Sequence, residues 1–224
     1  MKELDCKELN NTELNNTELD YKVVASGSSG NAVRIENLMV DCGIPYKHLK
    51  DELYKCRYLF ITHKHTDHLM ITTYKKIRKE FPRIKVYANY DVANHLQQKS
   101  LAVDVITGIK DFQLSSDLNI ETFEVPHNVY VQGFTMKYKD INAIYVTDSA
   151  GTKTWRKGKY DYLFIESNHD DEKLSQACVG RYGDRTYKNS KRHTSTLESK
   201  AFYFMNRKSD KSKYIELHKS NRFY

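Results

Sequence analysis

The chain has 224 residues and carries 36 lysines and arginines against 29 aspartates and glutamates, which gives a formal net charge of +7. A chain of this length can bury the core of one large domain or of two small ones. No apolar run approaches the roughly 20 residues that a membrane-spanning helix requires, and this excludes an integral membrane protein. The N-terminal residues lack the apolar segment of a secretory signal, so we expect a cytoplasmic protein without a membrane partner.

Residues 2–21 repeat with a period of five, as KELDC, KELNN, TELNN and TELDY. This period matches neither a helix nor a strand, and four such short copies cannot bury a solenoid core. We interpret residues 1–20 as a low-complexity acidic extension, with a partner-binding arm as the alternative. Because no linker rich in proline, glycine or serine divides the rest, we expect residues 21–224 to form a single domain.

Short strand-like runs begin directly after the extension. Strands are predicted at 21–26, 31–36, 38–41, 58–62, 84–88, 118–125, 129–138, 141–148, 160–167 and 213–217. Helices are predicted at 45–54, 69–80, 171–179 and 194–205. Glycine and asparagine separate the first three strands, which favours antiparallel pairing. Two clusters of strands separated by helices predict two sheets packed face to face with helices outside.

The segment ITHKHTDHL places His63, His65, Asp67 and His68 directly after a predicted strand. Three imidazoles and a carboxylate so close together would repel one another if charged alike, and a metal ion is the usual reason to assemble them. In an irregular turn, His63 and His65 can point to one ion while Asp67 and His68 point to a second. The spacing therefore favours a dinuclear centre, and a histidine-rich surface loop is the alternative.

Three further candidate ligands follow other predicted strands. His127 comes after ETFEVP, Asp148 ends the strand AIYVT, and His218 follows KYIEL. Loops at strand ends are held by a rigid scaffold, and functional side chains are often placed there. We therefore expect these residues to join the cluster from the ITHKHTDHL segment.

The H-x-H-x-D-H run resembles the signature of the metallo-β-lactamase superfamily. ASGSSGN (25–31), VDCG (40–43), VTDSAG (146–151) and ESNHD (166–170) are similar to motifs of its YycJ/WalJ-like branch, and the likeness extends over most of residues 22–224. The resemblance implies an α/β (α+β) fold, the four-layer αββα sandwich, with two divalent metal ions at the sheet edges. Zinc and manganese are the leading candidates and iron is a third, since sites built from His and Asp accept all three.

The resemblance also implies a role for each candidate ligand. Asp148 would bridge the two ions, and Asp67 would also orient the attacking water in a hydrolysis reaction. Asp41 is expected to orient a ligating histidine. The ligands implied for the first ion are His63, His65 and His127, and those implied for the second are Asp67, His68 and a later histidine.

Two histidines compete for the last ligand position. The order of motifs resembles the tRNase Z branch, in which a histidine before a helix assists the leaving group and a later histidine after a strand binds metal. His218 is therefore assigned as the ligand and His193 as the general acid, with the reverse assignment as the principal alternative. Thr194 and Ser195 begin the predicted helix, whose backbone amides can receive a phosphate.

The ESNHD motif supplies two more candidates. Asn168 and His169 are expected to line the cleft, where they contact phosphate or hold a ligand; a buried structural network is the alternative. The branch usually has aspartate after the histidine that corresponds to His127, and Asn128 stands there instead. The absence of this carboxylate beside His127 changes the surroundings of that ligand, and it can alter which metal the first site prefers.

The charge of the second half favours a polyanionic substrate. Between Gly180 and Tyr224 there are 12 lysines and arginines against four aspartates and glutamates, interleaved with tyrosine and phenylalanine. Aromatic rings beside a cationic groove can stack on bases, although a solvated basic face is an equal alternative for any single residue. Together with the resemblance, this predicts a metal-dependent phosphodiesterase and nuclease, most specifically a DNA exonuclease acting on DNA ends or single strands.

The tyrosine-, lysine- and asparagine-rich composition with its repetitive extension suits a phage or prophage gene. In that setting the protein would act in the bacterial host cytoplasm, in phage recombination or DNA processing, beside a single-strand annealing recombinase. Three alternatives remain open. They are a cyclic-nucleotide phosphodiesterase of the anti-defence type with a pocket built across a homodimer, an RNA-processing nuclease, and a DNA-binding module without catalysis.

Overall fold

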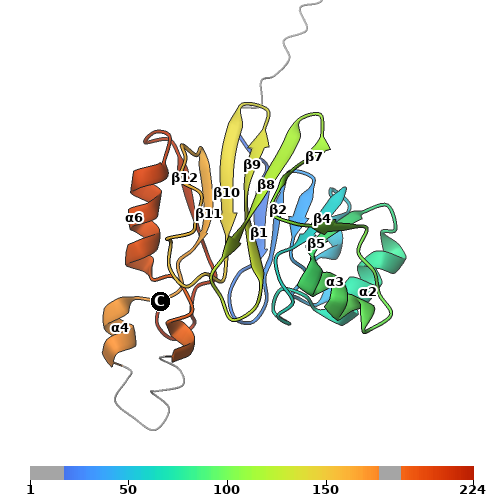
Figure 1. Cartoon of the computed structure of the whole chain (residues 1–224), viewed down its shortest axis with the longest axis horizontal. Coiled ribbons are helices and arrows are strands. Elements are labelled where there is room, and N and C mark those ends of the chain that lie inside the picture. The colour runs from blue at the N-terminus through green and yellow to red at the C-terminus, as the bar shows by residue number, and fades with distance from the viewer. Residues whose placement is uncertain (1–17, 177–187) are drawn as a thin grey trace, which may run out of the picture.

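Two six-stranded β-sheets form the centre of the computed structural model, which describes residues 18–176 and 188–224 (Figure 1). The first sheet has the order β1-β2-β3-β4-β5-β6. Its strands are β1 (Tyr21–Ala25), β2 (Ala32–Ile35), β3 (Leu38–Val40), β4 (Tyr58–Ile61), β5 (Lys85–Asn89) and β6 (Val105–Thr107). The strands β1, β2 and β3 pair antiparallel, as expected from the sequence, and β3 to β6 pair parallel.

The second sheet has the order β12-β11-β10-β9-β8-β7. Its strands are β7 (Asp111–Ser115), β8 (Leu118–Val125), β9 (Val131–Tyr138), β10 (Ile141–Val146), β11 (Tyr162–Glu166) and β12 (Lys213–Leu217). The strands β7 to β10 form an antiparallel meander, while β10, β11 and β12 run parallel. Parallel strands end at the same edge of a sheet, so the loops after β10, β11 and β12 meet there.

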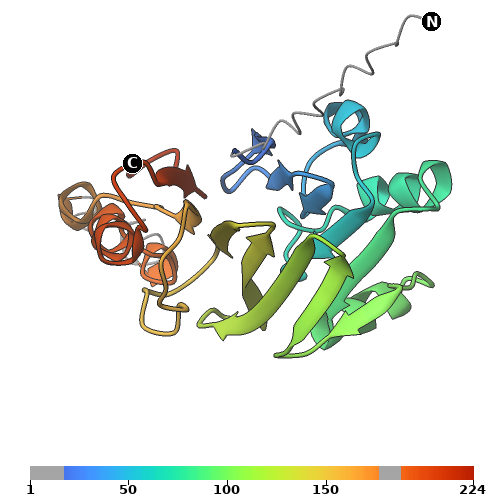
Figure 2. The same ribbon diagram turned by 90° about the horizontal axis from the view of Figure 1, so that it is seen from above.

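The helices lie outside the two sheets, which gives the α/β sandwich that the sequence predicts (Figure 2). The first sheet is accompanied by the 3-10 turn η1 (Tyr46–His48), α1 (Lys50–Leu53), α2 (Ile71–Glu80) and α3 (Tyr90–Gln97). The second sheet is accompanied by α4 (Asp171–Gln176) and α6 (Thr196–Asn206). In the part of the chain that the structure describes, no helix is both long enough and apolar enough to cross a bilayer.

Alternation along the central strands divides the core into layers. In β4, Leu59 and Ile61 face the helices of the first half, whereas Phe60 faces the second sheet. In β11, Phe164 joins the layer between the sheets while Leu163 packs toward α6. Because successive side chains of a strand point to opposite faces, strands that are apolar on both faces are covered on both sides.

The predicted strands are present with every end within two residues of its predicted position, and three elements were missed. The predicted helix 45–54 is wrong in its continuity, because η1 and the single turn α1 occupy that stretch. The missed elements are α3, β6 and β7. The helix predicted at 171–179 is present as α4, and residues 177–179 lie outside the described residues.

The last residues of the acidic extension pack against the domain. Leu19 is buried, and its N–H donates to the hydroxyl of Tyr162 at 3.2 Å. The carboxylate of Asp20 pairs with Arg34 at 2.8 Å. Residues 1–17, which contain the earlier copies of the repeat, lie outside the described residues.

Candidate metal centre

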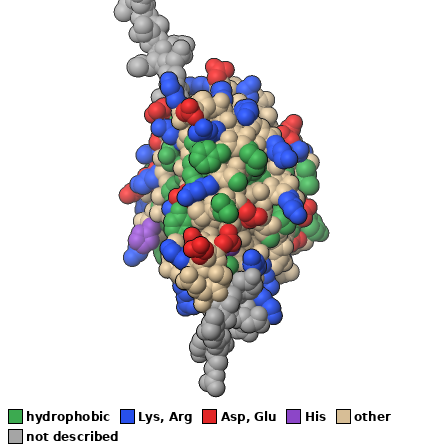
Figure 3. All heavy atoms as spheres, turned by 90° about the vertical axis from the view of Figure 1, so that its left-hand side faces the viewer, with side chains coloured by type: hydrophobic (Ala, Val, Ile, Leu, Met, Phe, Trp, Pro, Cys, Tyr) green, Lys and Arg blue, Asp and Glu red, His purple; other side chains and the backbone are tan. Residues whose placement is uncertain are grey.

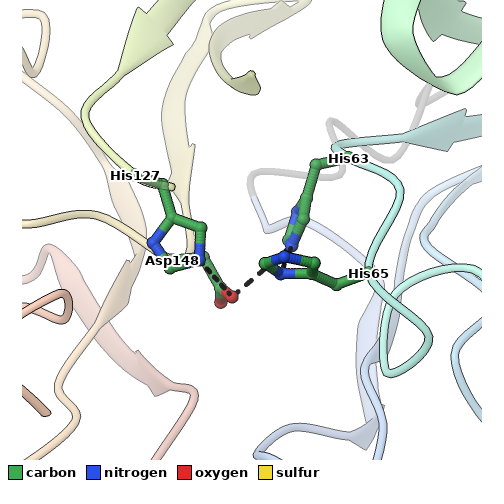
Figure 4. A group of neighbouring side chains, drawn as sticks. All are labelled: His63, His65, His127 and Asp148. Carbon is green, nitrogen blue, oxygen red and sulfur yellow. Dashed lines mark hydrogen bonds and ion pairs between the residues drawn. The ribbon is translucent and has the colours of Figure 1, made fainter. Parts of the chain in front are cut away.

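Four side chains from three loops converge on one point at the edge of the sandwich. His63 and His65 follow β4, His127 follows β8, and Asp148 follows β10 (Figure 4). The Nε2 atom of His63 lies 3.0 Å from Nδ1 of His65 and 3.5 Å from Oδ2 of Asp148. The Nε2 atom of His127 lies 3.7 Å from the same carboxylate oxygen.

A second group forms around the other oxygen of Asp148. Nε2 of His68 and Nε2 of His218 each lie 3.3 Å from Oδ1 of Asp148. Oδ2 of Asp67 lies 3.5 Å from the first of these nitrogens and 3.4 Å from the second. The carboxylate of Asp148 therefore faces two separate sets of donor atoms with its two oxygens.

The spacing of these atoms fits divalent cations. Within each group, one ligand atom per residue can be chosen so that all lie within 4.8 Å of one another. Ligands about 2.1 Å from a tetrahedral ion are themselves about 3.4 Å apart, which is close to the separations found here. Nitrogen and carboxylate oxygen are donors that zinc, manganese and iron accept. The residues present could therefore hold two such ions with Asp148 between them.

Close backbone packing positions the loop that carries Asp67. A Cβ built on Gly43 would lie 1.7 Å from the backbone oxygen of Asp67, so only glycine fits beside this loop. Asn31, from the ASGSSGN segment, accepts from the N–H of Gly27 and donates to the backbone oxygens of Gly27 and Asp67. The two glycine-bearing segments thus fix the loop between β4 and α2.

Strained backbone marks three residues of the centre. Asp41, Asp148 and His218 have φ values of 62°, 50° and 53°, in the left-handed region that side chains with a Cβ seldom adopt. Such conformations persist where the surrounding structure holds them, and they often accompany functional sites. Here each of them turns a buried side chain toward the centre at the end of a strand.

Asp41 holds the His68 ring from behind, as expected from the sequence. Its Oδ2 lies 2.7 Å from Nδ1 of His68, and its Oδ1 accepts from the backbone N–H of Thr62 at 2.8 Å. Both Asp41 and His68 are fully buried. The bond to Nδ1 leaves Nε2 of His68 facing Asp67 and Asp148, which is the orientation a metal ligand requires.

The electrostatic field differs between the two groups. Burial alone would lower the pKa of His218, but the carboxylates of Asp148, Asp67 and Glu166 outweigh it and raise this pKa to about 10. In the first group burial dominates, and it lowers the pKa of His127 to about 4. Although burial opposes it, the field of His218 and His68 holds the pKa of Asp148 well below its ordinary value. The carboxylates around His218 therefore make the second group the more negative of the two, and this favours the binding of positive charge there.

Glu166 is a further residue of the centre that the sequence interpretation did not single out. It is fully buried at the end of β11, and its Oε1 lies 2.6 Å from Nδ1 of His193 and 3.4 Å from Nδ1 of His218. Its Oε2 accepts from the backbone N–H groups of Ser149 and Thr194. A carboxylate at the end of an otherwise apolar strand was the available signal, since such a charge is seldom buried without partners.

His193 belongs to a third group of possible ligands, with Asp148, Glu166 and His218, which adjoins the two groups described above. Its ring stacks on that of His218 with centroids 4.9 Å apart and lies 5.3 Å from that of His127. Burial would lower the pKa of His193, but the adjacent Glu166 carboxylate outweighs this and raises it. His218 contacts both Asp67 and Asp148, whereas among the described residues His193 makes no ion pair with either, and this favours His218 as the ligand.

The remaining candidates lie mainly in a buried network. Asn168 donates to the backbone oxygen of His218 at 2.7 Å, and the Nδ1 atom of buried His169 has no hydrogen-bond partner within the described ranges. Thr194 donates its hydroxyl to the backbone oxygen of Ser149 and its N–H to Glu166. Ser195 caps α6 by accepting from the N–H of Glu198. These bonds engage the side chains of both residues and the N–H of Thr194 inside the protein, and a phosphate contact at the start of α6 stays a prediction.

Two adjoining cavities open over the centre. The first, of about 370 Å³, is lined by residues that include His65, Asp67, Asn128, Asp148 and Arg192. The second, of about 400 Å³, continues past His193 toward residues 220–223. Ser28, Asn189, His193 and His218 line both, so the two form one groove with the donor groups at one end.

Comparisons with known proteins agree with this architecture. Residues 37–200 match the family described as the β-lactamase superfamily domain. Exodeoxyribonuclease WalJ of Streptococcus pneumoniae serotype 2 is 26% identical over 172 residues, which cover 69% of this chain and 64% of that protein. The chain thus spans less than two thirds of the length of this relative.

Two solved structures show the same fold at low sequence identity. Zn(2+)-bound PqqB from Methylobacterium extorquens has a TM-score of 0.68 at 12% identity, over 91% of this chain and 90% of that one. The short form of human tRNase Z has a TM-score of 0.63 at 15% identity, over 90% of this chain and 93% of that one. At such identities the likeness concerns the fold alone.

Proposed function

We propose, from the premise that this chain belongs to the metallo-β-lactamase superfamily, that it is a metal-dependent phosphodiesterase of the nuclease type, and more narrowly a DNA exonuclease acting on DNA ends or single strands. The observation that carries the proposal is the carboxylate of Asp148, whose two oxygens face two sets of histidine and aspartate donors. A pair of adjacent cation sites of this kind suits hydrolysis of a phosphodiester.

Each donor residue is assigned a role in this proposal. Divalent cations bound here would polarise the phosphodiester and lower the pKa of water toward neutrality. Asp148 is shared between them, and Asp41 and Asn168 hold the rings of His68 and His218. The residues that would hold the first cation are His63, His65 and His127, and those for the second are Asp67, His68 and His218.

Two side chains handle protons in the proposed reaction. Asp67 orients the attacking water and accepts its proton at the carboxylate. His193 gives a proton to the departing oxygen, and because Glu166 occupies Nδ1 of this ring, Nε2 is the nitrogen that is free to do so. General acid catalysis from such a position typically contributes 10²–10⁴-fold in rate.

Cations around the groove favour a polyanionic substrate. Arg192 lines the cavity over the donor groups and Arg222 lines the adjoining one. Lysine and arginine side chains are also scattered over the face of the molecule that carries α6 (Figure 3). Positive charge spread along a groove tracks a nucleic-acid backbone. The exodeoxyribonuclease activity named for the WalJ relative makes DNA our first choice among nucleic acids.

The cellular location and the partners that we propose follow from a DNA substrate. We place the activity in the cytoplasm, in the host's if the gene belongs to a phage, with residues 21–224 acting as one hydrolase domain and residues 1–20 as an extension. A single-strand annealing recombinase is the partner that we would test first, since an exonuclease supplies its single-stranded substrate. Gel filtration with light scattering would test for the homodimer.

Hydrolysis assays on three labelled substrates test the proposal. Purified protein is incubated with DNA, RNA or a cyclic nucleotide in the presence of manganese, zinc or EDTA. We expect DNA to be degraded with metal and to remain intact with EDTA. Degradation of cyclic nucleotides alone would favour the anti-defence phosphodiesterase, degradation of RNA alone an RNA-processing nuclease, and DNA binding without turnover a non-catalytic module.

A matched pair of histidine variants tests the mechanism. His65→Ala removes a donor of the first group and should reduce turnover at least 100-fold with little change in solubility. His48→Ala changes an exposed histidine that belongs to none of the donor groups and should leave turnover unaltered. Full turnover by His65→Ala would remove the proposed metal centre from the reaction.

A further inference from the structure

The cavity of about 400 Å³ beside His193 has a lining unlike that of the metal centre. We propose that it is a nucleotide subsite, which holds the nucleoside monophosphate unit on the leaving-group side of the scissile phosphate. The inference rests on the proposed function and adds to it a recognition site for one unit of the substrate. It assigns Arg222, Phe223 and Asn221 to that recognition.

The position of the cavity determines which part of the substrate it can take. It shares His193 and His218 with the cavity over the donor groups, so a ligand can pass from one to the other without leaving the groove. His193 lies at the junction between them. A phosphate over Asp67 and Asp148 would therefore place the group that receives the His193 proton in the second cavity.

In the reaction so arranged, the oxygen of water forms a bond to phosphorus, and the bond from phosphorus to the leaving oxygen breaks. Asp67 takes the proton of the water, and His193 gives one to the leaving oxygen. The released unit is then an alcohol at the end of a nucleotide, which occupies the second cavity.

The lining has the chemistry that a nucleotide requires. Among the described residues no carboxylate lines this cavity, and the side chains that do include the amides of Asn168, Asn189 and Asn221. Amides both donate and accept hydrogen bonds, as base edges and sugar hydroxyls do. Arg222 supplies a planar cation suited to phosphate, and Phe223 supplies an aromatic ring on which a base can stack.

Arg222 is available for a ligand. It is exposed, and within residues 18–176 and 188–224 its guanidinium forms no ion pair. A cation that lines a cavity with no acidic neighbour in that lining attracts an anionic ligand.

The wall that carries Arg222 and Phe223 is held in place before any ligand binds. The N–H of Ser220 donates to the backbone oxygen of Asn168 at 2.8 Å, and the N–H of Asp170 donates to that of Phe223 at 2.7 Å. Lys173 donates to the backbone oxygen of Tyr224 at 2.9 Å, which anchors the same turn to α4. Preformed walls reduce the ordering cost of binding.

Direct binding of deoxythymidine monophosphate tests the subsite without any turnover. Calorimetric titration would compare the full-length wild type with Arg222→Ala and with Lys211→Ala, which removes an exposed cation that does not line the cavity. We expect Arg222→Ala to weaken binding about tenfold and Lys211→Ala to leave it unchanged. Equal affinities for wild type and Arg222→Ala would overturn the inference. Unfolding midpoints of all three proteins should agree, because the Arg222 side chain makes no ion pair among the described residues.

Kinetics on two substrates separate this inference from the proposed function. Bis(p-nitrophenyl) phosphate lacks a nucleoside, whereas a short oligodeoxynucleotide fills the groove. Arg222→Ala and Phe223→Ala should raise KM about five- to tenfold for the oligonucleotide and leave the nitrophenyl ester unaffected. Equal losses on both substrates would overturn the subsite, and no metal-dependent hydrolysis of either by the wild type would overturn the proposed function.

Discussion

Oε1 of Glu166 lies 2.6 Å from Nδ1 of His193, and the carboxylate that makes this contact is completely buried. Its other oxygen accepts from two backbone N–H groups, so the carboxylate cannot rotate away from the ring. The pair resembles the arrangement by which a fixed carboxylate sets the tautomer and direction of a catalytic histidine. In the proposed reaction Glu166 is thus a positioning residue, and the proton transfer is assigned to His193.

Replacement of His193 should affect substrates according to their leaving groups. His193→Ala is expected to lower kcat about 100-fold or more for DNA, whose leaving alcohol needs a proton. For bis(p-nitrophenyl) phosphate the loss should be small, because nitrophenolate departs without one. Glu166→Gln should follow the same pattern with a smaller loss. Steady-state kinetics of both variants on both substrates test this prediction. Equal losses of kcat on DNA and on the nitrophenyl ester would contradict the role of His193 as general acid.

Removal of the charge behind His68 should weaken metal binding. Asp41→Asn keeps the size of the side chain but removes its charge, and it leaves one acceptor oxygen where the carboxylate has two, for Nδ1 of His68 and for the N–H of Thr62. Substitutions of such supporting carboxylates typically cost 10–100-fold in metal affinity. Zinc titration in competition with a chelator would measure the effect. Asp51→Asn, at an exposed position on α1, is the matched control, and equal affinities for the two variants would refute the prediction.

The close approach at Gly43 should make this residue irreplaceable. Gly43→Ala would place Cβ 1.7 Å from the backbone oxygen of Asp67, so the loop that carries Asp67 must shift. We expect a loss of about 1–3 kcal/mol in the free energy of unfolding, together with a lower metal content. Gly108→Ala is the control, because a Cβ there meets nothing within 4 Å. Urea unfolding and elemental analysis of both variants would show whether only the first is affected.

Acid should weaken the buried ion pair that joins α1 to the first sheet. Hydrogen bonds from Lys22 and Arg34 outweigh burial and lower the pKa of Glu52 from its ordinary value of 4.5 to about 2. A carboxylate whose pKa is lower in the folded state stabilises the protein above its unfolded pKa, and this contribution is lost as the pH falls. The loss should therefore run from about pH 4.5 down to about pH 2.

Comparison with Glu52→Gln would isolate this contribution. At neutral pH the variant should be less stable by about 3 kcal/mol, because buried Arg34 then keeps only its pair with the largely exposed carboxylate of Asp20. The difference in the free energy of unfolding between wild type and variant should shrink through the same acid range. A difference that stays constant from pH 7 to pH 2 would show that Glu52 does not titrate as inferred.

The sequence reveals most strands because their apolar runs are bounded by glycine, asparagine or charged residues. Helix α3 was not predicted from the sequence. The segment YDVANHLQ continues directly from β5, and its first turn contains Tyr90 and Val92, which are residue types that favour strands. The helix start was marked only by Asn89, whose side chain accepts from the N–H of Val92. β6 and β7 are short, and their alternation is too brief to separate from loop.

The candidate centre was visible in the sequence wherever several donors lie close together or end a strand. Glu166 was missed because its partners, His193 and His218, are 27 and 52 positions away. The parallel pairing of β11 with β12 brings His218 beside Glu166, and the segment before α6 brings His193 there. Thr194 and Ser195 were expected to face a phosphate. Thr194 instead donates its N–H to the buried carboxylate of Glu166, a partner that no local sequence pattern indicates. Ser195 instead caps α6.

The contact between Asp67 and His218 spans 151 positions of the chain and closes only when β12 has paired with β11. A ribosome-bound or partly misfolded chain that has not completed this sheet therefore lacks the second donor group. The centre is therefore complete only in the native state, and the chemistry proposed for it depends on the pairing of β12 with β11.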